Sequence, residues 1–164
     1  MNIILIGMMG SGKSTVAKKL SKELCMEVLD TDTLIEKNEK MSIKDIFEKQ
    51  GEHYFRKLEE KLFFEIASSE NSIISTGGGA VLNDTLRPLD NQKIIYLKWS
   101  VGGLISNLTS KVDNRPLLED ESLEKKLSDI YTKRKFLYEN WANYTIECDN
   151  KSVNEVVNEI IKFI

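Results

Sequence analysis

The hydrophobic and polar positions of this chain form two kinds of segment: short apolar runs, and longer stretches with apolar residues three or four positions apart. The short runs are IILI at 3–6, EVLD at 27–30, SIIST at 72–76, KIIYLK at 93–98 and YTIEC at 144–148. Most of them lack polar alternation, which is typical of strands in a parallel sheet that helices cover on both faces. The second run is the weakest, and its assignment rests mainly on its position.

Helical spacing lies between the runs and predicts helices over 14–24, from 42 onward, over 52–66, over 123–141 and from 152 to about 164. Two of these begin with a serine that an acidic residue follows three positions later, a capping pattern: Ser42 with Asp45 and Ser152 with Glu155. Alternating strands and helices predict a single α/β domain over 1–164 with a doubly wound sheet. The stretch 31–68 is helical throughout, and we expect it to be an inserted lobe that binds substrate.

Composition places the chain among ordinary globular proteins. Of its 164 residues 41% are apolar and 30% charged, and no apolar run approaches the roughly 20 residues of a membrane helix. The net charge of −3 argues against a nucleic-acid-binding protein, which usually has a basic face. Cys25 and Cys148 lack metal-ligand spacing, which indicates free thiols in a reducing compartment. With no basic flank on its apolar N-terminus, we expect a cytoplasmic protein without a signal peptide.

The segment GMMGSGKS, residues 7–14, matches the phosphate-binding pattern G-x-x-x-x-G-K-[ST] between a predicted strand and a predicted helix. Its glycines let successive N–H groups surround a phosphate at the positive end of a helix. Lys13 reaches the β- and γ-phosphates, and the Ser14 hydroxyl is an oxygen ligand suited to Mg²⁺. A tight turn without a ligand is the alternative, but the motif in this place predicts that the chain binds a nucleoside triphosphate.

Two aspartates follow the second predicted strand, in LDTDTLIE, whereas the end of the third strand carries no acid. Asp30 is expected at the carboxyl end of the strand and Asp32 two residues further out, at the edge of the sheet where ligands bind. One carboxylate can hold Mg²⁺ through water while the other accepts a hydroxyl proton. Alternatively, Asp32 is the N-cap of the following helix.

Three glycines and two arginines predict a second site for a small anionic acceptor. Gly77–Gly79 follow the strand expected beside the P-loop strand, where bare backbone lets a polar acceptor lie against the chain; a flexible turn is the alternative. Arg134 falls on the apolar seam of its helix and needs an anion, either an internal carboxylate or a ligand. Arg56 lies beside the apolar stripe of another helix, where a surface ion pair with Glu59 is the alternative.

A third arginine, Arg115, lies in the polar segment KVDNRPLL. The flanking pair Gly102–Gly103 and Pro116 suit a mobile lid at about 108–120. Closure of such a lid can bring an arginine to the phosphoryl group in transfer. The single histidine, His53, follows Gly-Glu at a helix start and is assigned a structural or solvated role.

In combination these segments resemble the shikimate kinase family. They run in order through the chain to about Cys148: GMMGSGKST, DTDTLIE, SIKDIFEKQGEHYFRKLE, STGGG, NRPLL and RKFLYENWA. Each segment alone is moderately specific, whereas their order and spacing together are highly specific. The resemblance implies an ATP- and Mg²⁺-dependent enzyme that phosphorylates the 3-hydroxyl of shikimate, on the route to chorismate and the aromatic amino acids.

The resemblance also implies a three-layer P-loop fold like that of the nucleoside monophosphate kinases, with five parallel strands in the order 2-3-1-4-5. By matching position it implies ATP-binding residues Gly10, Ser11, Gly12, Lys13, Ser14, Thr15 and Arg115, and Mg²⁺-binding residues Ser14 and Asp30. It implies shikimate-binding residues Asp32, Arg56, Gly77, Gly78, Gly79 and Arg134, with Glu59 close by, and catalytic residues Lys13, Asp32 and Arg115. We expect a monomer that acts on shikimate and ATP without nucleic acid or membrane.

One position departs from the family pattern. Family members often carry an arginine that packs on adenine about seven residues before the lid arginine, where this chain has Leu108. We therefore expect adenine stacking by this route to be lost and base selectivity to be relaxed. The alternatives to shikimate kinase are a kinase for another small anionic acceptor, such as gluconate or a nucleoside monophosphate, and an ATP-binding switch that transfers nothing. A nucleic-acid-handling ATPase is a minor alternative.

Overall fold

The structure, a computed structural model, describes residues 1–83, 86, 92–110 and 120–164. Its elements in chain order are β1 (Asn2–Ile6), α1 (Lys13–Leu24), β2 (Glu27–Asp30), α2 (Thr31–Glu39), α3 (Ile43–Ala67), β3 (Ser72–Ser75), the short 3₁₀ helix η1 (Ala80–Leu82), β4 (Gln92–Lys98), α4 (Val101–Thr109), α5 (Asp120–Trp141), β5 (Tyr144–Glu147) and α6 (Val153–Phe163). All five predicted strands are present. The predicted helices are present too, with ends that differ by a few residues.

The five strands form one parallel sheet in the order β2-β3-β1-β4-β5, as the family resemblance implied. Leu5 of β1 and Asp30 of β2 both lie opposite Ser75 of β3, so these three strands end side by side. Because parallel strands present their carboxyl ends at one edge, the loops that follow them meet there. The P-loop, the aspartates and the glycine segment therefore converge.

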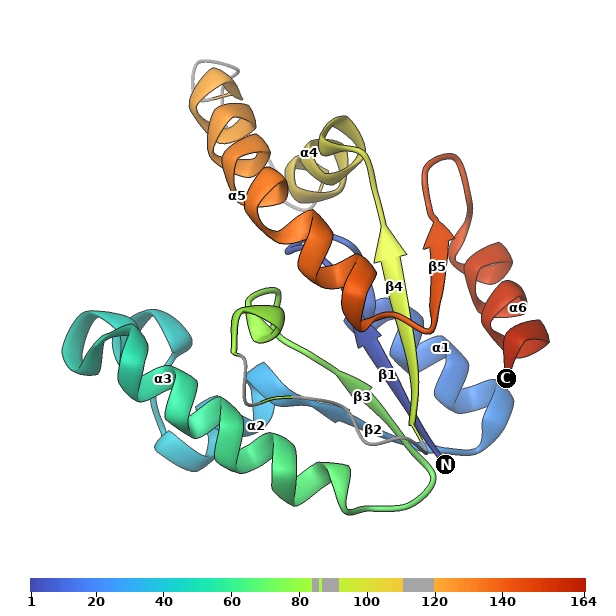
Figure 1. The fold of residues 1–164 in the computed structure, drawn as a ribbon, viewed down its shortest axis with the longest axis horizontal. Coiled ribbons are helices and arrows are strands. Elements are labelled where there is room, and N and C mark those ends of the chain that lie inside the picture. Colours follow the sequence, from blue (N-terminus) through green and yellow to red (C-terminus); the bar gives the residue numbers. More distant parts are fainter. Residues whose placement is uncertain (84–85, 87–91, 111–119) are drawn as a thin grey trace.

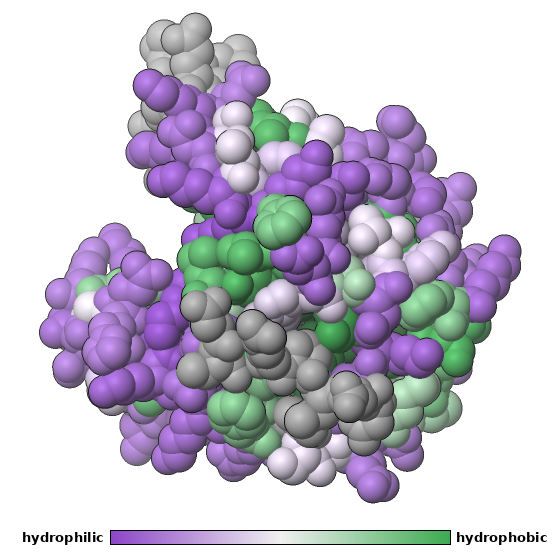
Figure 2. Space-filling view, in the orientation of Figure 1, coloured by the Kyte–Doolittle hydropathy of each residue, from purple (hydrophilic) through white to green (hydrophobic). Residues whose placement is uncertain are grey.

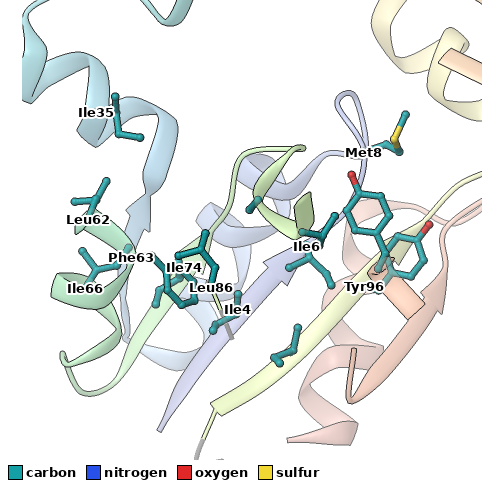
Figure 3. Packing of buried hydrophobic residues seen from close by; sticks show 14 of the residues in the cluster. Ile4, Ile6, Met8, Ile35, Leu62, Phe63, Ile66, Ile74, Leu86 and Tyr96 are labelled. Carbon is teal, nitrogen blue, oxygen red and sulfur yellow. The ribbon is translucent and has the colours of Figure 1, made fainter. Parts of the chain in front are cut away.

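Helices cover both faces of the sheet, which explains why the strands lack polar alternation (Figure 1). On one face Ile4 and Ile6 pack into a core with residues from α2, α3, α4 and α5. Figure 3 shows part of this core, where Leu62, Phe63 and Ile66 of α3 lie over the sheet. On the other face Ile3 and Leu5 pack with α1 and α6.

Helix α3 contains a break at Gly51, whose φ of 83° and ψ of 169° are not helical. Such backbone angles are essentially confined to glycine, which explains the residue found there. The break joins the helix predicted to start at Ser42 to the one predicted from Glu52. Together α2 and α3 account for the helical stretch expected at 31–68, whose role as a substrate-binding lobe stays a prediction.

The expected lid lies only in part within the described structure. Gly102 and Gly103, which we expected to flank a mobile segment, lie in the first turn of α4, and the Gly103 N–H donates to the Ser100 hydroxyl at 3.1 Å. Arg115 and Pro116 lie outside the described residues. Among the helices that are described, none combines the length and apolar character needed to cross a membrane.

Candidate functional site

The P-loop connects β1 to α1 and carries left-handed backbone at two of its glycines. Gly10 has a φ of 80° and Gly12 a φ of 82°, angles that residues with a Cβ atom rarely adopt. Inside the loop the Ser11 N–H donates to the Met8 carbonyl at 3.1 Å. From outside, Trp99 Nε1 donates to the Ser11 carbonyl at 3.0 Å. The loop is thus held in a curved shape at the start of α1.

Lys13 lies within this loop and is 8% exposed. Its ammonium group donates to the carbonyls of Gly7 at 2.8 Å and Met8 at 2.9 Å, and to the Ser11 hydroxyl at 3.3 Å. Burial lowers the pKa of Lys13 to about 8, although the negative charges of Asp32 and Asp30 oppose this shift. A phosphate entering the loop would therefore meet a cation whose charge is sensitive to pH near neutrality.

Ser14 and Asp30 form the candidate metal site. The Ser14 hydroxyl donates to Asp30 Oδ2 at 2.7 Å. Burial raises the pKa of Asp30, but the hydrogen bonds it accepts, first from Ser14, outweigh burial and hold that pKa below its usual value. An ionised carboxylate beside a hydroxyl fits Mg²⁺, which is commonly bound through few protein oxygens together with phosphates and water. No cluster of three or more acidic, histidine or cysteine ligands occurs within the described part of the chain.

The sequence left open whether Asp32 is the N-cap of the helix that follows β2, and the structure shows that it is not. Asp30, not Asp32, is the N-cap of α2, because its Oδ1 accepts the Thr33 N–H at 3.1 Å. Asp32 lies in the first turn of α2, where its side chain is free to face the glycine segment. Burial and the nearby charge of Asp30 raise the pKa of Asp32, while Lys13 opposes that shift. A carboxylate with a raised pKa is better suited to accept a proton.

Each of the three glycines after β3 lies where a side chain would collide with a different part of the site. A Cβ at Gly77 would lie 2.7 Å from Asp32 Oδ1, and one at Gly78 would lie 3.0 Å from the Met9 backbone nitrogen. A Cβ at Gly79 would lie 2.4 Å from a guanidinium nitrogen of Arg56. A side chain at Gly77 or Gly79 would displace the end of Asp32 or of Arg56, and one at Gly78 would press on the P-loop backbone, which argues against a merely flexible turn.

Arg56 is paired with two glutamates, of which Glu59 is buried and Glu52 is exposed. Its Nη1 donates to Glu59 Oε2 at 2.8 Å, and Glu59 is 1% exposed. Its Nη2 and Nε donate to Glu52 Oε1 at 3.2 and 3.4 Å. Burial raises the pKa of Glu59, although its bonds to Arg56 oppose the shift. The other oxygen, Glu59 Oε1, is buried without a hydrogen-bond partner in the described structure.

Arg134 of α5 reaches the glycine segment across the site. Its Nη1 donates to the Gly78 carbonyl at 2.9 Å, and the Tyr138 hydroxyl donates to the same oxygen. Within the described residues no carboxylate forms an ion pair with Arg134, so the internal carboxylate considered from the sequence is not its partner here. The charge of Arg134 is left available to an anion.

Three cavities next to the P-loop are formed by the described residues. The first, which we call the phosphate cavity, has a volume of about 380 Å³ and contains Lys13, Ser14, Asp30 and Asp32. The acceptor cavity, of about 370 Å³, is lined from α3 by Arg56 and Glu59, from α5 by Arg134, and by Gly77–Gly79. Figure 2 shows the surface hollowed between the parts formed by α2–α3 and by α4–α5. Asp32, Met9 and Gly78 line both cavities, so the two spaces adjoin.

The base cavity, about 320 Å³, lies on the other side of the P-loop. Gly10, Gly12 and Thr15 line it from the P-loop and the start of α1, Trp99 and Asn107 line it from the α4 region, and Lys151 and Ser152 from the start of α6. Leu108 packs against the P-loop instead: a Cβ at Gly10 would lie 2.8 Å from Leu108 Cγ. Leu108, which stands where family members often have an arginine, therefore supports the P-loop. Relaxed selectivity for the base remains a prediction.

The structure brings together every predicted site residue that it describes, which leaves out Arg115. It also reveals residues that sequence reasoning missed. The Thr31 hydroxyl accepts the Gly77 N–H at 3.0 Å, the Ser75 hydroxyl lies 3.4 Å from that of Ser14, and Tyr138 contacts Gly78. For Tyr138 a signal existed, because it follows Arg134 by four residues on the same helix. For Thr31 and Ser75 the sequence offers no comparable signal.

Comparison with known proteins agrees with this geometry. The family model described as shikimate kinase matches residues 9–164. The shikimate kinase of Caldanaerobacter subterraneus subsp. tengcongensis is 42% identical over 163 residues, which are 98% of this chain and 94% of that protein. The shikimate kinase of Sulfurihydrogenibium sp. is 43% identical over 162 residues, with 98% and 95% covered.

Solved structures give the same result. Shikimate kinase from Acinetobacter baumannii in complex with shikimate matches with a TM-score of 0.88 and 35% identity, covering 99% of this chain and 91% of that one. Deoxyadenosine kinase from M. mycoides with bound dATP, at 18% identity and a TM-score of 0.65 with 99% and 98% covered, shares the fold alone. On the family match and the extent of these identities, the chain belongs to the shikimate kinase family.

Proposed function

We propose that this chain transfers the γ-phosphoryl group of ATP to the 3-hydroxyl of shikimate, giving shikimate 3-phosphate and ADP. The observation that carries the proposal is the acceptor cavity. There Asp32, the guanidinium groups of Arg56 and Arg134, and bare backbone at Gly77–Gly79 surround a space that adjoins the phosphate cavity. A hydroxylated carboxylic acid fits this chemistry, since guanidinium groups bind carboxylates and a carboxylate accepts hydroxyl protons.

The proposed mechanism is an in-line displacement in which the protein positions groups and neutralises charge. The acceptor oxygen attacks the γ-phosphorus, the bond from that phosphorus to the ADP oxygen breaks, and the hydroxyl proton passes to Asp32. The raised pKa of Asp32 favours this proton transfer. Lys13, and Arg115 from the segment 108–120 acting as a lid, are assigned to the charge on the transferred group.

Ser14 and Asp30 are the residues proposed to hold Mg²⁺, on the strength of their 2.7 Å contact. When bound there the ion would neutralise charge on the phosphates of ATP. We further propose that the enzyme acts as a monomer in the cytoplasm. In support of this compartment, both Cys25 and Cys148 are free thiols.

The proposal predicts that ADP release depends on shikimate. A coupled assay with ATP and Mg²⁺ should show rapid ADP formation with shikimate, and little with gluconate, with a nucleoside monophosphate or without any acceptor. The product should carry phosphate on the 3-oxygen, which phosphorus NMR can establish. Turnover with one of the other acceptors instead of shikimate would support a different kinase, and ATP binding without acceptor-dependent turnover would support the switch.

A second prediction concerns the dependence of ATP use on pH. Because kcat/KM for ATP reports groups of the enzyme form that ATP binds, and the pKa of Lys13 is lowered to about 8, kcat/KM should fall as the pH rises through about 8. Below that pH the ammonium group is charged and the phosphates are bound; above it the charge is lost. The profile should be measured at saturating shikimate. A flat profile across this range would show that Lys13 keeps its charge throughout, contrary to its lowered pKa.

A further inference from the structure

Tyr138 is a buried polar residue next to the acceptor cavity that none of the roles described so far uses. It is 1% exposed and lies one helical turn after Arg134 on α5. Its hydroxyl donates to the Gly78 carbonyl, the same oxygen that accepts from Arg134 Nη1 at 2.9 Å. Two donors from one helix therefore converge on a single oxygen of the glycine segment, from 56 and 60 residues away in the sequence.

We propose that Tyr138 is a positioning residue for the acceptor, which fixes the peptide between Gly78 and Gly79 and, through the shared carbonyl, the guanidinium of Arg134. The inference rests on the proposed function, because it takes Arg134 and the glycine segment as acceptor-binding groups. It goes beyond that function by assigning a role to a side chain that need not touch the acceptor.

The glycine segment needs a hydrogen bond that restrains it, because three residues without Cβ atoms give the backbone more conformational freedom than three residues of any other type. A peptide group is planar, so holding the Gly78 carbonyl also fixes the direction of the Gly79 N–H on the opposite side of the plane. The P-loop restrains the segment at another point, since a Cβ at Gly78 would lie 3.0 Å from the Met9 nitrogen. The tyrosine thus fixes a segment that would otherwise have several orientations.

Tyr138 is itself well fixed. Its ring stacks on the ring of Tyr96, with centroids 5.0 Å apart and planes 20° apart. Burial raises the pKa of Tyr138 to about 12, although the Arg134 charge opposes this shift. The hydroxyl therefore keeps its proton at neutral pH and remains a donor to the Gly78 carbonyl. A rigid ring that carries a permanent donor has the properties of a positioning group.

The test is Tyr138→Phe, which keeps the ring and its stacking on Tyr96 but removes the hydrogen bond. We expect the KM for shikimate to rise by about three- to tenfold, the range for the loss of one hydrogen bond, while the KM for ATP stays within about twofold. Tyr144→Phe is the matched control. The Tyr144 hydroxyl donates to Glu159 at 3.2 Å and its ring stacks on Phe163, so the same change is made far from the acceptor cavity.

A second readout does not depend on turnover. Amide hydrogen exchange in the segment Gly77–Ala80 of the free protein should be faster in Tyr138→Phe than in wild type, and unchanged in Tyr144→Phe. Unchanged exchange and unchanged KM for shikimate would overturn the inference, as would an equal rise in both KM values with a loss of stability. If wild type fails to phosphorylate shikimate, the proposed function fails, and the exchange experiment still decides whether Tyr138 holds the glycine segment.

Discussion

Replacing Lys13 with methionine is expected to lower kcat by about a hundred- to a thousandfold, the range seen when a preorganised charge donor is removed from a transition state. Methionine preserves most of the apolar stem but has no charge. The folded protein should tolerate the change, because burial already disfavours the ammonium group, as its lowered pKa shows. Steady-state kinetics with ATP and shikimate, together with a thermal melt, would measure both effects.

Lys22→Met is the matched control, since it removes an exposed lysine from the last turn of the same helix. Its kcat should remain within about twofold of wild type, as is usual for surface changes. Lys13→Met should also abolish the fall in kcat/KM for ATP above about pH 8. A variant with near wild-type kcat would exclude Lys13 from phosphoryl transfer, and one that keeps the fall would assign the fall to another group.

Arg134→Ala is expected to lower kcat/KM for shikimate by about 30- to 150-fold, with most of the change in the KM for shikimate and little change in the KM for ATP. The figure corresponds to about 2–3 kcal/mol, the lower part of the range for truncating one partner of a charged hydrogen-bonded pair, because Arg134 is only half-buried. The acceptor cavity would keep Arg56, whose charge Glu52 and Glu59 already offset.

Two comparisons sharpen this experiment. Arg134→Lys keeps the charge but loses the planar fork, so it should recover part of the affinity for shikimate and not all of it. Lys135→Ala removes an exposed positive charge from the adjacent position of α5 and should leave both KM values unchanged. Unaltered acceptor kinetics in Arg134→Ala would remove Arg134 from the acceptor site and weaken the proposed function with it.

The strands, the P-loop and the inward position of Arg134 could be predicted from the sequence, because each depends on a local pattern of residues. The apolar runs identified the strands because parallel strands buried on both faces need no polar alternation, as the fully buried β1 shows. The P-loop was recognisable because a phosphate cradle requires glycines and a lysine at fixed spacing. The inward position of Arg134 followed from the helical period, and its contact with Gly78 agrees with that position.

Contacts between distant segments could not be predicted. From the sequence, an N-cap role was an alternative for Asp32 alone, whereas Asp30 has that role, because α2 begins directly where β2 ends against β3. The pairing of Arg56 with Glu52 as well as Glu59 depends on side-chain orientation after the break at Gly51. The helical period places Tyr138 on the same side of α5 as Arg134, but its contact with Gly78 also requires α5 to pack beside η1, which the period does not predict.

The helices that support the P-loop and the helices that line the acceptor cavity pack on opposite faces of the sheet. The P-loop is anchored by β1 and α1, and α1 packs with α6 on one face; the charged side chains that line the acceptor cavity come from α2, α3 and α5, which pack on the other. New acceptors can therefore be accommodated by altering the second group of helices, without rebuilding the machinery that handles triphosphate. A library randomised at Asp32, Arg56 and Arg134, three charged residues that line the acceptor cavity, would therefore be the starting point for changing acceptor choice.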